Sequence, residues 1–110
     1  MQDCSRIVDR GYHKSYPYDV FEPDGVTIRG LQGATVVATM KVAGQTVLEK
    51  NLVVVNAAAG RVQLDFSPAE SRLIPEGRLT TIEIQLMQNG NEIAIGRGML
   101  TGIGGGNPDA

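Results

Sequence analysis

The segment from residue 79 to residue 100 constrains the fold more than any other part of the chain. Residues 79–88 alternate apolar and polar side chains, and Asn89-Gly90 follows them directly. A period of two places one set of side chains on the core-facing side of a β-strand and the other set in solvent. Asn and Gly accept the two positive φ angles that a type I′ turn needs. The sequence therefore predicts an antiparallel hairpin formed by residues 79–88 and 92–100.

Similar period-two segments recur along the chain and are separated by turn residues. Residues 12–22, 34–42 and 61–66 show the pattern, and residues 46–50 and 52–55 are rich in β-branched residues. Pro17 marks the first segment as an edge or interrupted strand, because proline has no N–H. About seven short strands at this spacing are typical of an all-β sandwich or barrel. The residues predicted to lie in the core are Val36, Ala38, Met40, Val62, Leu64, Phe66, Ile82, Ile84 and Leu86.

One short helix is predicted between two late strands. Ser67-Pro68-Ala69-Glu70 has the spacing of a capping box, with proline at the first helical position. Pro75 ends this element because proline cannot continue a helix.

Length and charge limit the class of protein. A chain of 110 residues is one domain, and it can bury roughly 65% of the surface of its unfolded chain. The net charge is −2 and the basic residues are dispersed, so no nucleic-acid partner is predicted. No apolar run approaches the roughly 20 residues that span a bilayer. The first 20 residues lack the apolar region of a signal peptide, so we expect synthesis in the cytoplasm and no membrane association.

The predicted domain organisation has three parts. Residues 1–11 are polar and are expected to form a mobile N-terminal arm, and residues 12–101 form the β-sandwich domain. Residues 102–110 are rich in glycine and are expected to form a flexible tail, because they carry little apolar surface to pack.

The sequence offers little for catalysis, so we predict no enzyme activity, no catalytic residue, no cofactor and no metal. His13 is the only histidine and Cys4 the only cysteine. One thiol and one imidazole are too few ligands for a zinc site, and a single cysteine forms no internal disulfide.

The most suggestive side chains are aromatic and lie near the N-terminus. Tyr12, Tyr16 and Tyr18 are predicted to bind a partner protein, because tyrosine is enriched at interfaces. The alternative is that they form the inward face of the first strand. Both interpretations can hold for different members, since neighbours in a strand point to opposite faces.

The order of these turns and strands resembles the immunoglobulin-like domain at the N-terminus of tailed-phage baseplate upper proteins and of similar small phage virion proteins. The resemblance covers roughly residues 7–101. It rests on Arg10-Gly11, Pro23-Asp24-Gly25, residues 31–36, residues 59–68, residues 74–77 and the terminal hairpin that ends in Gly98.

The resemblance implies an immunoglobulin-like antiparallel β-sandwich that docks into a symmetric virion and has no catalytic residues. Baseplate members continue into a longer region, whereas this chain stops at Ala110, so a free-standing subunit is expected. A head decoration (cement) protein that stabilises the capsid is the first expectation, and a tail, neck or baseplate component is the second. The partners would be the major capsid protein or tail and baseplate proteins, together with copies of this chain in a closed oligomer such as a trimer. A host-surface or carbohydrate-binding module is the rival, and the lack of tryptophan counts against it.

Overall fold

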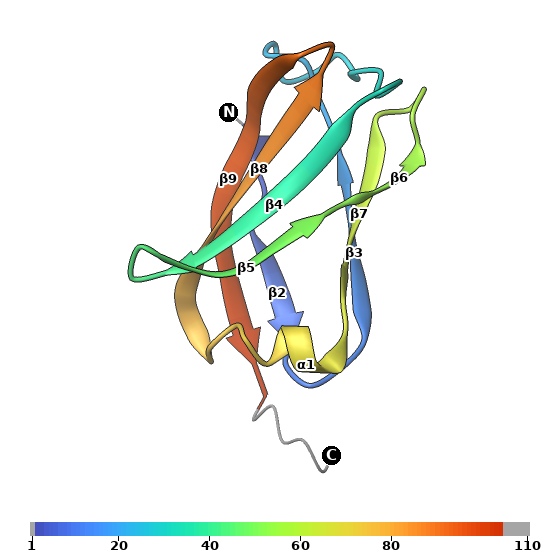
Figure 1. Cartoon of the computed structure of the whole chain (residues 1–110). Helices are drawn as coiled ribbons and strands as arrows, with labels where there is room; N and C mark the ends of the chain where they lie inside the picture. The colour runs from blue at the N-terminus through green and yellow to red at the C-terminus, as the bar shows by residue number, and fades with distance from the viewer. Residues whose placement is uncertain (1, 105–110) are drawn as a thin grey trace.

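The computed structural model describes residues 2–104, which form two β-sheets packed face to face (Figure 1). In the larger sheet the strand order is β1-β9-β8-β4-β5, and β2 also pairs with β9. Its strands are β1 (Gln2–Asp3), β2 (Arg6–Asp9), β4 (Thr35–Val42), β5 (Gln45–Asn51), β8 (Gly77–Gln88) and β9 (Asn91–Ile103). The smaller sheet has the order β3-β7-β6, and its strands are β3 (Lys14–Asp19), β6 (Val53–Asn56) and β7 (Arg61–Phe66).

The fold is all-β with the strand arrangement of an immunoglobulin-like sandwich. The sheet of β3, β7 and β6 corresponds to strands B, E and D of an immunoglobulin sandwich, and β4, β8 and β9 of the other sheet correspond to strands C, F and G. Strand β5 is an added strand at the edge beside β4. The first strands are the exception to the antiparallel pattern, because β1 and β2 pair in parallel with β9. Strand β3 has β7 as its one neighbour in its sheet, so the edge position predicted from Pro17 is confirmed.

The terminal hairpin is confirmed and is longer than predicted. Gln88 pairs with Asn91 across the turn, and Asn89 and Gly90 have φ angles of 54° and 77°. The register between β8 and β9 shifts twice, between Gly77 and Thr80 and between Ile84 and Gln85. All nine residues predicted to lie in the core are at most 1% exposed, and they form one cluster between the sheets.

A single helical turn joins β7 to β8, as predicted. Helix α1 (Pro68–Ser71) begins with the predicted capping box, in which the Glu70 amide donates to Ser67 Oγ at 3.1 Å. The Ser67 amide donates in return to Glu70 Oε1 at 2.9 Å. Lys50 of β5 adds an ion pair of 2.7 Å to the same carboxylate and donates to the carbonyl of Asp65. The helical turn therefore closes one end of the sandwich (Figure 1).

The expectation of a mobile arm over residues 1–11 is wrong for the residues that the structure describes. Residues 2–3 and 6–9 form β1 and β2, and Cys4 and Val8 are fully buried. The cause lies in β9: a Cβ atom at Gly98 would lie 2.5 Å from the Ser5 nitrogen, and one at Gly96 would collide with Gln2. Glycine at these positions lets the N-terminal backbone approach β9 closely enough to pair and pack.

The C-terminal boundary also differs from the prediction. Strand β9 continues to Ile103, two residues beyond the predicted end of the sandwich at residue 101. Gly102 pairs with Val8 of β2, and this added pairing explains why the strand continues. The rest of the predicted tail, residues 105–110, lies outside the described residues.

The close approach between the N-terminal segment and β9 generates a prediction. The substitution Gly98→Ala should lower the free energy of unfolding by about 1–3 kcal/mol, because the added methyl overpacks the contact with Ser5. Gly30→Ala is the matched control, because its Cβ would meet only the side-chain oxygen of Gln32, at 3.0 Å. Urea unfolding followed by circular dichroism measures both variants. Equal stability of the two variants would contradict the packing role assigned to Gly98.

Candidate partner-binding surface

Two of the three tyrosines predicted to bind a partner lie inside the sandwich. Tyr16 is 6% exposed and Tyr18 is 3% exposed. They are alternate residues of β3 and therefore face the same side, where the ring of Tyr16 meets Phe66 edge-on with centroids 5.7 Å apart. The partner-binding prediction is wrong for Tyr16 and Tyr18, and the alternative of an inward strand face is correct for them.

These buried tyrosines tie the smaller sheet to the N-terminal strands of the larger sheet. The Tyr18 hydroxyl donates to the Cys4 carbonyl at 2.8 Å, and the Asp9 amide donates to the Tyr16 hydroxyl at 3.2 Å. The guanidinium of Arg6 lies 4.1 Å from the centre of the Tyr18 ring. Burial raises the pKa of Tyr18, so its hydroxyl remains a donor at neutral pH. Tyr16 and Tyr18 thus hold residues 4–9 in place.

Tyr12 is the member of the group that stays exposed. Its side chain is 63% exposed in the turn between β2 and β3. Partner binding by Tyr12 remains a prediction.

The residues considered for chemistry are not brought together. Cys4 is fully buried, and burial raises the pKa of its thiol to about 11, whereas His13 is exposed. Within residues 2–104, no group of three or more His, Cys, Asp or Glu side chains is placed to hold a metal ion. In the same part of the chain, no helix is long and apolar enough to cross a membrane.

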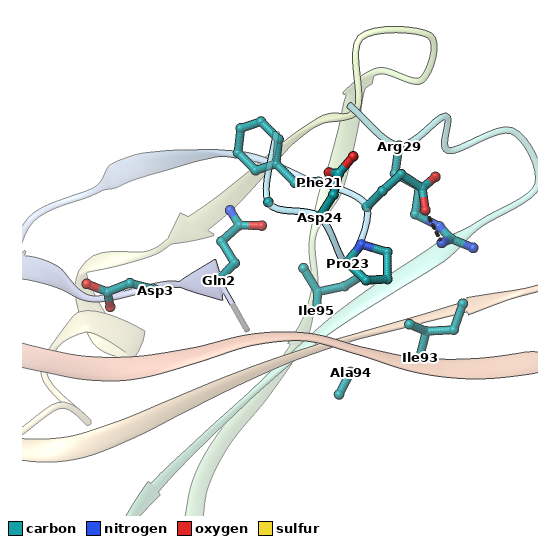
Figure 2. A pocket seen from close by; sticks show the side chains of 11 residues that line it. Gln2, Asp3, Phe21, Pro23, Asp24, Arg29, Ile93, Ala94 and Ile95 are labelled. Atoms are coloured by element: carbon teal, nitrogen blue, oxygen red, sulfur yellow. Dashed lines mark hydrogen bonds and ion pairs between the residues drawn. The ribbon is translucent and has the colours of Figure 1, made fainter. Parts of the chain in front are cut away.

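A hollow lies beside β9 at the end of the molecule where β1 begins (Figure 2). It measures about 680 Å³ and is walled by the loop of residues 21–29, by Gln2 and Asp3 of β1, and by residues 93–95 of β9. We call it the β9 groove. Figure 2 shows Ile93 and Ile95 rising from β9 toward this loop, with Pro23 above Ile95 and Ala94 on the opposite side of the strand.

One edge of β9 is open along this groove. Strand β1 begins to pair with β9 at Gly96, so no backbone among residues 2–104 pairs with that edge between Asn91 and Ile95. Antiparallel partners alternate between hydrogen-bonded and non-hydrogen-bonded pairs, and Gln88–Asn91 closes the two-residue turn as a bonded pair. Glu92 and Ala94 are therefore non-bonded with β8 and direct their N–H and C=O groups to the open edge.

The β9 groove is acidic. Three carboxylates line it, from Asp3, Glu22 and Asp24, against the one guanidinium of Arg29, which leaves a local charge of −2. Arg29 pairs with Glu22 at 3.1 Å and donates twice to the side-chain oxygen of Gln88, so each of its three guanidinium nitrogens has a partner. Hydrogen bonds from Ser5 lower the pKa of Asp3, and those from Thr27 lower the pKa of Asp24.

A second surface is the outer side of the larger sheet near the end of β9. Residues 99, 101 and 103 point outward because Leu100 and Gly102, between them, are buried. Ile7 pairs opposite Thr101, and Met99 pairs opposite Thr81, next to the exposed side chain of Leu79. The outer apolar patch comprises Ile7, Leu79, Met99 and Ile103, and three of them, Ile7, Leu79 and Ile103, are 59%, 59% and 44% exposed.

Neither of these two surfaces was identified from the sequence. The β9 groove joins segments that are distant in the chain, and only its Pro23-Asp24-Gly25 turn carried a sequence signal. The outer apolar patch had a detectable signal, since Leu79 and Met99 are apolar residues at positions where the alternation predicts polar ones. Comparison with protein-family models and with curated proteins finds no match to this chain.

The environment of Cys4 generates a prediction. The native protein should not react with a thiol reagent such as DTNB at neutral pH, because the sulfur is buried and its pKa is raised to about 11. The same thiol should react fully in guanidinium chloride. Absorbance at the thionitrobenzoate band measures both rates. Rapid labelling of the folded protein would show that the N-terminal segment opens readily.

Proposed function

We propose that this protein is a non-catalytic structural subunit of a tailed-phage virion that binds copies of itself and other virion proteins. The outer apolar patch is the observation that carries the proposal. Large apolar side chains exposed near one another on a sheet face can mark a protein interaction site. Burial of one large aliphatic side chain contributes about 1.5–3 kcal/mol, so this patch can supply the centre of an interface.

The surroundings of the patch fit an interface between subunits. A shallow hollow beside Ile7 and Met99 is rimmed by the polar side chains of Asp3, Arg6 and Arg78. An apolar centre with a polar rim is the usual anatomy of a protein interface. Copies that associate through identical faces form a two-fold dimer, and copies in which the patch contacts a different face of the next copy can close into a ring such as a trimer. Closed oligomers of this kind are the form expected of a virion subunit.

The location in a phage particle rests on the resemblance of the sequence to immunoglobulin-like virion domains. Features that carry this resemblance are present as structural elements, including the turn at Asp24-Gly25, the capped helical turn after β7, and the hairpin of β8 and β9. The head surface, where a decoration subunit would contact the major capsid protein, is the first location to test. A tail, neck or baseplate position is the second.

Self-association through the patch gives one prediction. The substitution Leu79→Glu should shift the protein toward the monomer, because it places a charge within the apolar contact. Val53→Glu is the matched control, since Val53 is 52% exposed and lies on β6 of the other sheet. Sedimentation equilibrium over a range of concentrations measures the assembly state. An oligomer unaffected by Leu79→Glu, or a wild-type monomer at all concentrations, would contradict the role of the patch.

Residence in the particle gives a second prediction. Immunogold electron microscopy of purified virions should show label from an antibody raised against this protein. Label spread over heads would indicate a decoration subunit, and label confined to tails or necks would indicate the second location. Particles without label, together with the absence of its peptides from denatured virions by mass spectrometry, would refute the structural role.

A further inference from the structure

We propose that the β9 groove binds an extended, basic segment of a partner protein, which adds as a strand to the open edge of β9. This deepens the proposed function, because it names how the chain holds one of its partners. The groove and the outer apolar patch lie on different parts of β9, and Asp3 borders both the groove and the hollow beside the patch.

The backbone of β9 supplies the first part of the site. The N–H and C=O groups of Glu92 and Ala94 point to the open edge, and an extended peptide can pair with all four. Addition of a strand to a sheet edge gives affinity through main-chain hydrogen bonds. Further along the same edge, β1 already pairs with Gly96 and Arg97 in this way. The ligand would therefore continue a line of pairing that the fold itself uses.

The side chains above the edge supply the apolar part of the site. Ile93 and Ile95 form the apolar floor of the β9 groove, where Ile95 is packed in the core and Ile93 is partly buried against it. Phe21 and Pro23 wall the far side of the groove (Figure 2). Alternate side chains of an extended peptide point the same way. One apolar side chain of the ligand can thus enter between the β9 isoleucines and Pro23 while its neighbours point out of the groove.

The charge of the groove selects a basic ligand. The carboxylates of Asp3 and Asp24 are ionised at neutral pH, because their hydrogen bonds hold both pKa values below the usual range. The only guanidinium in the lining, that of Arg29, is engaged by Glu22 and Gln88. A Lys or Arg side chain next to the inserted apolar residue points toward the mouth of the groove. There it would meet the exposed carboxylates of Asp3 and Asp24, which form no ion pair among residues 2–104.

Hydrogen bonds within the 21–29 loop hold the wall of the groove in place without a ligand. In the 21–29 loop, the Glu22 amide donates to the Thr27 carbonyl at 2.7 Å, and the Arg29 amide donates to the Val20 carbonyl at 2.9 Å. Asp24 Oδ1 accepts from the amides of Val26 and Thr27. A loop held in one conformation reduces the entropy that binding must remove.

The experiment uses two synthetic peptides as probes, blocked at both ends: Lys-Val-Thr-Val-Lys-Val and its acidic counterpart Glu-Val-Thr-Val-Glu-Val. Hydrogen exchange of the ¹⁵N-labelled full chain is followed by NMR with about 1 mM peptide, a concentration that detects even weak binding. With the basic peptide, the amides of Glu92 and Ala94 should exchange about tenfold more slowly. This protection should weaken as salt is added, and the acidic peptide should give none.

Two variants test the backbone and the charge separately. Ala94→Pro removes an N–H that faces the open edge and should abolish protection at Glu92, while proline at a free edge leaves the rest of the sheet intact. Asp24→Asn keeps the side-chain oxygen that accepts hydrogen bonds within the loop but removes the charge. It should weaken binding of the basic peptide about threefold or more. Glu49→Gln on exposed β5 is the control and should change nothing. If Ala94→Pro does not fold, the comparison of Asp24→Asn with Glu49→Gln decides.

Three results would overturn the proposal: no protection at Glu92 and Ala94, equal binding of the two peptides, or protection confined to another edge strand, β3, β5 or β6. The peptide test does not depend on the oligomeric state, and Leu79→Glu should bind the basic peptide as the wild type does. A negative result for strand addition would therefore not contradict the proposed role of the outer apolar patch in the virion. A negative result for the patch or for the virion role would likewise not contradict strand addition.

Discussion

The close approach of the N-terminal segment to the glycines of β9 is the contact on which the rest of this structure depends. Gly96 and Gly98 leave no side chain where the backbone of residues 2–5 passes, so Cys4 enters the core and β1 and β2 pair in parallel with β9. Tyr16 and Tyr18 of the opposite sheet then bind this segment through their hydroxyls. The two sheets are thereby joined at the edge where the chain begins.

The same contact determines where β9 is open. Because β1 starts to pair at Gly96, the part of β9 nearer the hairpin turn keeps its outer backbone groups free beside an acidic, partly apolar groove. Downstream of the contact, β2 covers the edge of β9 and its outward-facing Ile7 joins the outer apolar patch. One strand thus carries two surfaces for partners, an edge at one end and a face at the other.

Local patterns predicted the parts of the fold that depend on local chemistry. Alternation located the core residues, Asn89-Gly90 located the hairpin turn, and Ser67 to Glu70 located the helical turn. The N-terminal strands were missed because their polar composition resembles that of an arm and their partner lies some 90 residues away in the sequence. The spacing of glycines within β9 was the available signal, since glycine inside a strand marks close backbone approach.

The candidate surfaces were beyond local reasoning for a different physical reason. Alternation placed Tyr16 and Tyr18 on one side of β3, but only the packing of the second sheet determines that this side is buried. The β9 groove exists because three segments distant in sequence meet and because one edge strand starts late. Tertiary contacts of this kind leave no periodic pattern in the chain.

The central claim is that the open edge of β9 binds a partner protein. Hydrogen exchange, measured residue by residue on the isolated chain and on the chain in its assembly, tests this claim most directly. Ile93 faces β8 as a bonded pair and should be protected in both states. Glu92 and Ala94 should exchange readily in the isolated chain and become protected in the assembly. Fast exchange of Glu92 and Ala94 in both states would contradict a binding role for the open edge of β9.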